Sequence, residues 1–413
     1  MSIHQINLSA QKTLRDIALL WSGTGVAQFL TVIYTLVIAR HLAPSSYGLF
    51  VAAYSVAGLS SFFFNWGFDS WLLRQGAITS SLSRLTGQIL AVKSILGTLW
   101  SMSLFVVLPA LVPEMFPASL VLVGALDTLC DGLFNTELAS LNATRRSPIA
   151  SGLLFISRGG RLVGAILLVL GGIQSPSQFA LARLIATFIG FCLAIVIVTP
   201  DFLTPFSALS SIFRDSVPFT LSQLLSTVYI QADETMLALM LADKQMVGLY
   251  APASGFVNSL FVILAAGFTV MVPILTQMQK AKAQLFAPTV KRMYLGYIAL
   301  GVLLWVGLWA GSQLFIELLL GHAYSVTGGL LAILSPIVFF KCVGFASSAV
   351  LVAVGWQKYR LVAQGLSAGT NVFLNLWVIP RYGVWGVSYV YVVSELVLVT
   401  GYIWLVTKWF KSM

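Results

Sequence analysis

The chain has 413 residues, of which 58% are hydrophobic and only 9% are charged, and its net charge is +10. In soluble domains about a quarter of the residues are charged, so this composition excludes an aqueous domain of any size. The basic residues are scattered over short polar breaks and form no stripe. The positive charge therefore does not indicate nucleic-acid binding.

Apolar stretches of roughly 20 to 25 residues recur along the whole chain. A helix of about 20 apolar residues, rising about 1.5 Å per residue, spans a hydrocarbon core of about 30 Å. In chain order we expect helices over residues 16–39, 48–73, 85–108, 119–141, 149–171, 179–198, 217–241, 247–275, 293–319, 327–354, 358–379 and 384–407. The sequence predicts an all-α polytopic membrane protein with about twelve transmembrane helices.

Basic residues in the breaks fall almost entirely on one side of the membrane. If the N-terminus is cytoplasmic, fifteen lysines and arginines lie on the cytoplasmic side, and only Arg40, Lys244 and Arg381 lie on the outer side. Basic loops remain in the cytoplasm during insertion. The bias predicts an even helix number, with both termini in the cytoplasm.

Charged residues also occur inside the predicted helices. Each costs at least about 2.5 kcal/mol near the bilayer centre unless it is paired or faces a wet cavity. The basic ones are Lys93, Arg158, Arg161, Arg183 and Lys341, and the acidic ones are Asp69, Asp127, Asp131, Glu137, Asp233, Glu234, Glu317 and Glu395. So many intramembrane charges predict a polar pathway or cavity through the helix bundle.

The chain divides near a proline-containing break at residues 199–216 into two halves, residues 1–200 and 201–413. The halves resemble each other: HLAPSSYGLF at residues 41–50 aligns with MLADKQMVGLY at residues 240–250 after one gap. Because each half has an even number of predicted helices, a duplication places both in the same orientation. We expect two similar six-helix bundles with a central cleft.

Three motifs resemble those of the polysaccharide-repeat flippases of the O-antigen (Wzx) type, in the superfamily that also contains the MATE multidrug exporters. The first is LVIARHLAPSSYGLF at residues 36–50. The second combines VPF at 217–219, YIQAD at 229–233, VGLY at 247–250 and VP at 272–273. The third is YGVWGV at 382–387, so the resemblance covers the whole chain.

The resemblance implies a V-shaped, MATE-like pair of six-helix bundles in a prokaryotic inner membrane. It implies a flippase that moves an undecaprenyl-diphosphate-linked oligosaccharide from the cytoplasmic to the outer leaflet by alternating access, coupled to an ion gradient, for O-antigen, capsule or exopolysaccharide synthesis. Membrane lipids are further partners, and a polysaccharide polymerase and a chain-length regulator are candidate ones. We expect no cofactor and no metal ion.

A diphosphate needs cationic partners, and the first half contains four of the five intramembrane cations. We therefore expect Lys93, Arg158, Arg161 and Arg183 to contact the head group. The alternative is structural pairing. Counted from Arg145 in the turn between the fourth and fifth helices, matched depths allow Asp131 to pair with Arg158 and Asp127 with Arg161. The sequence leaves both roles open.

Four charged residues of the second half are candidates for coupling or gating: Asp233, Glu234, Lys341 and Glu395. Asp233 and Glu234 point about 100° apart on a helix, so we expect one of them to face the cleft. A buried carboxylate could couple transport to a proton gradient. A structural pair between Lys341 and Glu395 is equally compatible with their depths.

Other functions fit less well. The sequence GLSAG at residues 365–369 matches a nucleophile elbow, but it lies in the middle of an apolar stretch. His4, His41 and His322 lie outside mid-membrane positions, which favours neither a catalytic triad nor a metal site. A MATE-like multidrug or cation antiporter is the nearest alternative, and a membrane-embedded polysaccharide polymerase or ligase is an alternative of a different class.

Overall fold

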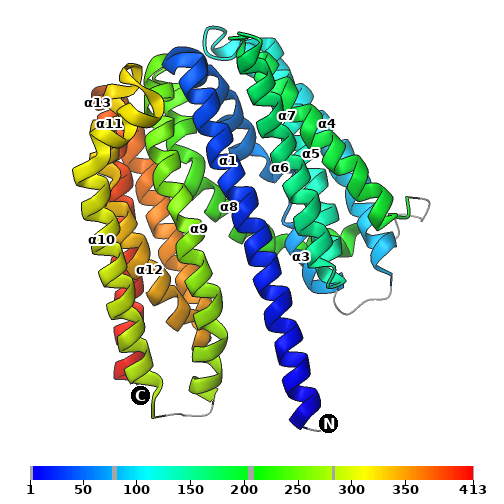
Figure 1. Cartoon of the computed structure of the whole chain (residues 1–413), viewed down its shortest axis with the longest axis vertical. Coiled ribbons are helices and arrows are strands. Elements are labelled where there is room, and N and C mark those ends of the chain that lie inside the picture. The colour runs from blue at the N-terminus through cyan, green and yellow to red at the C-terminus, as the bar shows by residue number, and fades with distance from the viewer. Residues whose placement is uncertain (1–2, 77–80, 203–208, 281–283, 413) are drawn as a thin grey trace. The chain divides into compact units, whose positions relative to one another are not determined.

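The computed structural model describes residues 3–76, 81–202, 209–280 and 284–412, and these form helices with no strand among them (Figure 1). The α-helices are α1 (Ile3–Ser60), α2 (Phe62–Asn65), α3 (Phe68–Gly76), α4 (Leu82–Leu111), α5 (Ala118–Ala143), α6 (Ser147–Leu170), α7 (Pro176–Val198), α8 (Leu209–Met240), α9 (Lys244–Lys280), α10 (Phe286–Leu320), α11 (Ser325–Leu334), α12 (Pro336–Ala353) and α13 (Gln357–Lys411). A short 3₁₀-helix, η1 (His322–Tyr324), precedes α11.

Most of the expected segments correspond to one helix each, but helix ends and breaks differ in four places. The range of α1 contains the first two segments, which meet at a break at Ala43, and the range of α13 contains the last two, which meet at a break at Gly383. The second segment is interrupted before α2 and again before α3, and the tenth is divided between α11 and α12. These two residues have φ values of 59° and 53°, outside the helical region, so each separates two helical stretches.

The helices have the length and composition of a multi-pass membrane protein. Eight helical stretches of the described residues are long and apolar enough to cross a bilayer. Large apolar side chains point outward from them: Leu170, Val196 and Phe373 are each at least 74% exposed. Such side chains are stable on the outside of a protein when lipid surrounds it. The all-α membrane fold predicted from the sequence is confirmed.

The chain forms two compact units. The first consists of Met1–Leu42 and Ala53–Leu224, and the second of Ala43–Ala52 and Leu225–Met413. The expected division at residue 200 lies before α8, whereas this division falls within α8. A short part of α1, after its kink, belongs to the second unit.

Each unit is built around one helix. In the first unit α5 packs against α3, α4, α6 and α7, and its core includes Phe64, Trp100 and Phe134. In the second unit α12 packs against α9, α10 and α13 around Leu275 and Trp409. These central helices carry apolar residues on most of their surface, as expected for helices surrounded by other helices.

The two similar sequence segments meet inside the second unit. Ala43 and Ala242 both have positive φ, at 59° and 51°, so each segment breaks its helix at the same place. A Cβ atom on Gly48 would overlap the backbone carbonyl of Lys244, and one on Gly248 would overlap that of Pro44. The contact is reciprocal, and glycine at both positions allows the two backbones to approach closely.

Replacement of Gly248 by alanine is expected to destabilise the protein by about 1–3 kcal/mol, because the new methyl group forces two backbones apart. The measurement is the thermal melting of the purified protein and its level in the membrane. Gly307→Ala in α10 is the matched control, because no atom lies within 4 Å of the added Cβ there. Equal melting of both variants would contradict the close-contact interpretation.

Candidate functional site

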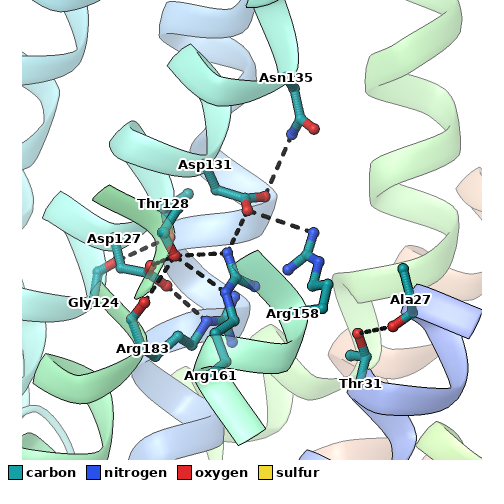
Figure 2. A network of polar contacts seen from close by, with 11 residues as sticks. Ala27, Thr31, Gly124, Asp127, Thr128, Asp131, Asn135, Arg158, Arg161 and Arg183 are labelled. Carbon is teal, nitrogen blue, oxygen red and sulfur yellow. Dashed lines mark hydrogen bonds and ion pairs between the residues drawn. The ribbon is translucent and has the colours of Figure 1, made fainter. Parts of the chain in front are cut away.

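Charged side chains from three neighbouring helices of the first unit form a connected network, which we call the arginine cluster (Figure 2). Helix α5 contributes Asp127 and Asp131, one helical turn apart. Helix α6 contributes Arg158 and Arg161, which lie three residues apart and so share a face. Helix α7 contributes Arg183. Because α7 packs against both α5 and α6, the three helices bring these residues together.

Asp127 is the buried anion of the arginine cluster. Its side chain is fully buried, and its Oδ2 atom lies 2.7 Å from Nε of Arg183. The guanidinium of Arg183 also stacks on the ring of Tyr54, with Cζ 4.2 Å from the ring centre. Arg183 is therefore held by an ion pair on one side and a cation–π contact on the other.

Asp131 joins the two arginines of α6. Its Oδ1 atom lies 2.5 Å from Nη2 of Arg161 and 3.5 Å from Nη2 of Arg158. The Arg161 side chain is only 3% exposed, whereas that of Arg158 is 19% exposed and has this long contact as its one ion pair among the described residues. Arg158 therefore retains donors for a further partner.

A threonine links the two halves of the arginine cluster. The hydroxyl of Thr187 on α7 accepts hydrogen bonds from Nε and Nη2 of Arg161, at 3.1 and 2.8 Å. The same hydroxyl donates to Oδ1 of Asp127 at 2.7 Å. Arg161 thus reaches Asp127 through Thr187, and each buried charge has several polar partners.

The arginine cluster has an excess of positive charge. Three guanidinium groups face two carboxylates, which leaves a formal charge of +1. The fully buried members, Asp127, Arg161 and Thr187, form its base, and Arg158, Asp131 and Arg183 are each about one fifth exposed. A partly exposed cationic site of this kind can bind an anion such as a phosphate.

The sequence-based pairing was right for one aspartate and wrong for the other. Asp131 lies beside Arg158, as expected, but it binds Arg161 more closely. Asp127 pairs with Arg183 and not directly with Arg161. The expected pairing rested on residues at equal depth in the membrane on two consecutive, antiparallel helices. Asp127 and Arg183 lie about two turns into α5 and α7, which start on the same side, so a comparison of parallel helices would have found this pair.

Lys93 lies in different surroundings from those expected of a head-group contact. Its side chain is fully buried, its Nζ atom lies 2.7 Å from Oδ1 of Asp69, and it also donates to the backbone oxygen of Gly132 at 3.2 Å. Thr136 donates to the same Asp69 oxygen at 2.7 Å. These contacts join α3, α4 and α5. They give Lys93 a structural role as the partner of Asp69, and this role needs no ligand.

A second polar group lies inside the second unit around Asp233 of α8, which is 5% exposed. Its carboxylate accepts hydrogen bonds from the Tyr250 hydroxyl at 3.2 Å and from Nδ2 of Asn375 at 2.7 Å. Asn375 also donates to Asn371 at 3.1 Å. Among the described residues Asp233 has no cationic partner, so its partners are neutral hydrogen-bonding groups from α9 and α13.

The remaining residues expected to act in coupling or gating have separate partners. Glu234 accepts a hydrogen bond of 2.6 Å from Ser254 on α9. Lys341 and Glu395 form an ion pair of 2.9 Å between α12 and α13. The structural pair between Lys341 and Glu395, which their depths in the membrane allowed, is thus present. Among the described residues, Lys341 forms no ion pair with Asp233.

Neither a metal site nor an enzyme motif is formed by the described residues. The described part of the chain contains no group of three or more His, Cys, Asp and Glu side chains able to hold a metal ion. The GLSAG sequence that matches a nucleophile elbow lies within the helix α13, where the strand-turn-helix context of that motif is missing.

The fold is similar to those of solved flippases and MATE transporters. A lipid II flippase MurJ in an inward closed conformation matches with a TM-score of 0.78 and 16% identity, over 94% of this chain and 87% of that one. An inward-facing MATE multidrug resistance transporter matches with a TM-score of 0.67 and 14% identity, over 91% and 93%. A MOP transporter from Pyrococcus furiosus, described as having a binding pocket of reverse polarity, matches with a TM-score of 0.64 and 14% identity, over 94% of both chains.

The family model for polysaccharide biosynthesis proteins matches residues 13–279, and the chain belongs to this family. No curated protein matches the sequence significantly. The resemblance to polysaccharide flippases and MATE exporters that the motifs predicted is confirmed.

Replacement of Asp127 by alanine is expected to destabilise the protein by about 3–5 kcal/mol, because it leaves Arg183 without its buried anion and removes the acceptor of the Thr187 hydroxyl, which binds Arg161. The measurement is thermal melting together with the level of protein in the membrane. Asp215→Ala is the matched control, because its pair with Arg214 is 3.5 Å long and largely exposed, and such pairs contribute little. Normal stability of Asp127→Ala would contradict the anchoring role of Asp127.

Proposed function

We propose that this protein flips an undecaprenyl-diphosphate-linked oligosaccharide from the cytoplasmic to the outer leaflet of a prokaryotic inner membrane, by alternating access. The product serves polysaccharide synthesis, and both termini of the chain lie in the cytoplasm. The family assignment supports the polysaccharide pathway. The fold, shared with a protein named as a lipid II flippase, supports transport of a lipid-linked sugar.

The excess positive charge of the arginine cluster is the observation that carries this proposal. A diphosphate has at least two negative charges and several acceptor oxygens, and arginine binds such groups through two parallel hydrogen bonds. Arg158 and Arg183 are the partly exposed guanidinium groups, so we assign them to the head group. Arg161 is buried and positions Asp131, while Lys93 takes no part in binding.

An organic-cation exporter would need an acidic and aromatic site. In the first unit the partly exposed Arg158, Arg183 and Asp131 belong to a cluster with a formal charge of +1, which favours an anionic ligand. The partly exposed Asp69 is neutralised by Lys93. The fold alone is compatible with both kinds of transporter, so the decision between them rests on this charge.

Replacement of Arg158 by alanine is expected to reduce export of the lipid-linked oligosaccharide to below about one tenth, because a charge-assisted hydrogen bond to phosphate is lost. The protein level should stay normal, since Arg158 has a single long ion pair. Arg158→Lys should retain part of the activity. Arg146→Ala, which removes an exposed charge in the turn before α6, is the matched control.

The readout is mass spectrometry of polyprenyl-linked glycans, with the leaflet assigned by lectin access to right-side-out and inside-out vesicles. In the deletion strain and with Arg158→Ala, one glycan species should accumulate in the cytoplasmic leaflet. Accumulation in the outer leaflet would instead indicate a polymerase or ligase. No accumulation in the deletion strain would favour a multidrug or cation exporter. Loss of the Arg158→Ala protein from the membrane would indicate a structural role for this residue.

We further propose that Asp233 couples transport to an ion gradient. The support is a buried carboxylate that neutral donors hold, with no cation among its described partners. A carboxylate in such surroundings is stable when a proton or a metal cation binds it.

Replacement of Asp233 by asparagine, which mimics the protonated acid, is expected to preserve the fold and remove the response of transport to an imposed gradient. The measurement is substrate movement in proteoliposomes with a proton or a sodium gradient. Glu317→Gln is the matched control, because Glu317 contacts Gln313 at an exposed position of α10. Unchanged gradient dependence in Asp233→Asn would contradict the coupling role.

A further inference from the structure

A cavity of about 170 Å³ lies inside the second unit, between α9, α12 and α13. One part of its wall is polar and comes from Lys341, Ser348, Arg360, Gln364, Glu395 and Tyr402. The rest is apolar and includes Phe268, Phe345 and Leu398. The cavity is separate from the arginine cluster, which belongs to the first unit.

The charged groups of the cavity wall do not balance. Lys341 is neutralised by Glu395, at 2.9 Å. Arg360 makes no ion pair among the described residues. The cavity wall therefore contains two cations and one carboxylate, and the surplus positive charge belongs to Arg360.

Arg360 is also incompletely hydrogen-bonded. Its Nη1 atom donates to the Ser348 hydroxyl at 2.8 Å, but its Nε atom is buried and has no hydrogen-bond partner among the described residues. The neighbouring residue Lys358 is exposed, as expected for a basic residue at the membrane surface. Arg360 is half-buried instead, and its guanidinium lines the cavity.

The position of Arg360 strengthens the positive field. It lies in the first turn of α13, which begins at Gln357, and the N-terminus of a helix carries a partial positive charge. Gln364 follows one turn later and so shares a face with Arg360. Two neighbouring side chains with N–H donors, Arg360 and Gln364, thus line the same cavity close to a helix N-terminus, and guanidinium and amide donors of this kind bind oxyanions.

We propose that this cavity binds a phosphate group, with Arg360 as its main ligand and Gln364 as a second donor. The apolar wall beside the donors favours a phosphate attached to an apolar body, such as the head group of an anionic lipid. Inorganic phosphate has the same donor requirements. The site uses none of the residues assigned to the diphosphate head group. The proposal of a phosphate site is therefore independent of the proposed export activity.

The test uses the full-length protein carrying Arg158→Ala, which removes one of the two phosphate ligands proposed for the first unit. Binding of dihexanoyl phosphatidic acid is counted by native mass spectrometry, and binding of inorganic phosphate is measured by equilibrium dialysis. We expect one bound phosphatidate per chain. Arg360→Ala should weaken binding at least about tenfold, because a hydrogen bond to a charged group is lost, and Gln364→Ala should weaken it about threefold.

Lys358→Ala removes the same charge from the same turn of α13 outside the cavity, and it should leave binding unchanged. Binding of both probes in competition would show that the phosphate group suffices, and binding of phosphatidate alone would show a lipid site; both outcomes support the proposal. Absence of binding by both probes would overturn it. So would equal affinity of the parent, Arg360→Ala and Gln364→Ala, with thermal melting used to confirm that each variant is folded.

Discussion

Burial of charge among membrane-spanning helices is the constraint on which the rest of this structure depends. A charged side chain near the bilayer centre is stable only with a partner of opposite sign or a dense set of hydrogen bonds. Asp127 meets this requirement through Arg183 and Thr187, and Lys93 meets it through Asp69. The first contact joins α5 to α7 and the second joins α3 to α4, so the pairs also fix which helices lie side by side.

The backbone follows a related rule. Peptide groups inside a membrane must be hydrogen-bonded within the protein, so a helix can bend only at a few residues. The breaks at Ala43 and Gly383 change the chain direction between two helical stretches of α1 and of α13. At Gly48 and Gly248 the missing side chains let two backbones touch. Close packing between equivalent segments thus replaces the hydrophobic effect, which is weak between helices in lipid.

The two units use polar groups in different ways. In the first, arginines outnumber aspartates in the cluster and two guanidinium groups are partly exposed, which suits an anionic ligand. In the second, Asp233 has only neutral partners, which suits a bound cation or proton. Arg360 has no ion pair among the described residues, and it lines a cavity of its own. A transporter that couples an anionic substrate to an ion gradient needs both kinds of group, and here they lie in separate units.

The sequence by itself determined the fold class, the approximate helices, the family and the residues that carry intramembrane charge, because hydrophobic length and local motifs depend on neighbours along the chain. The tertiary structure decided the partners. Asp127 binds Arg183 because α5 and α7 are packed side by side, and Lys93 is enclosed because α3 and α5 cover it. Arg360, which lies near the start of a predicted helix, is half-buried in a cavity. These outcomes depend on helix rotation and on packing between distant segments, which one sequence does not specify.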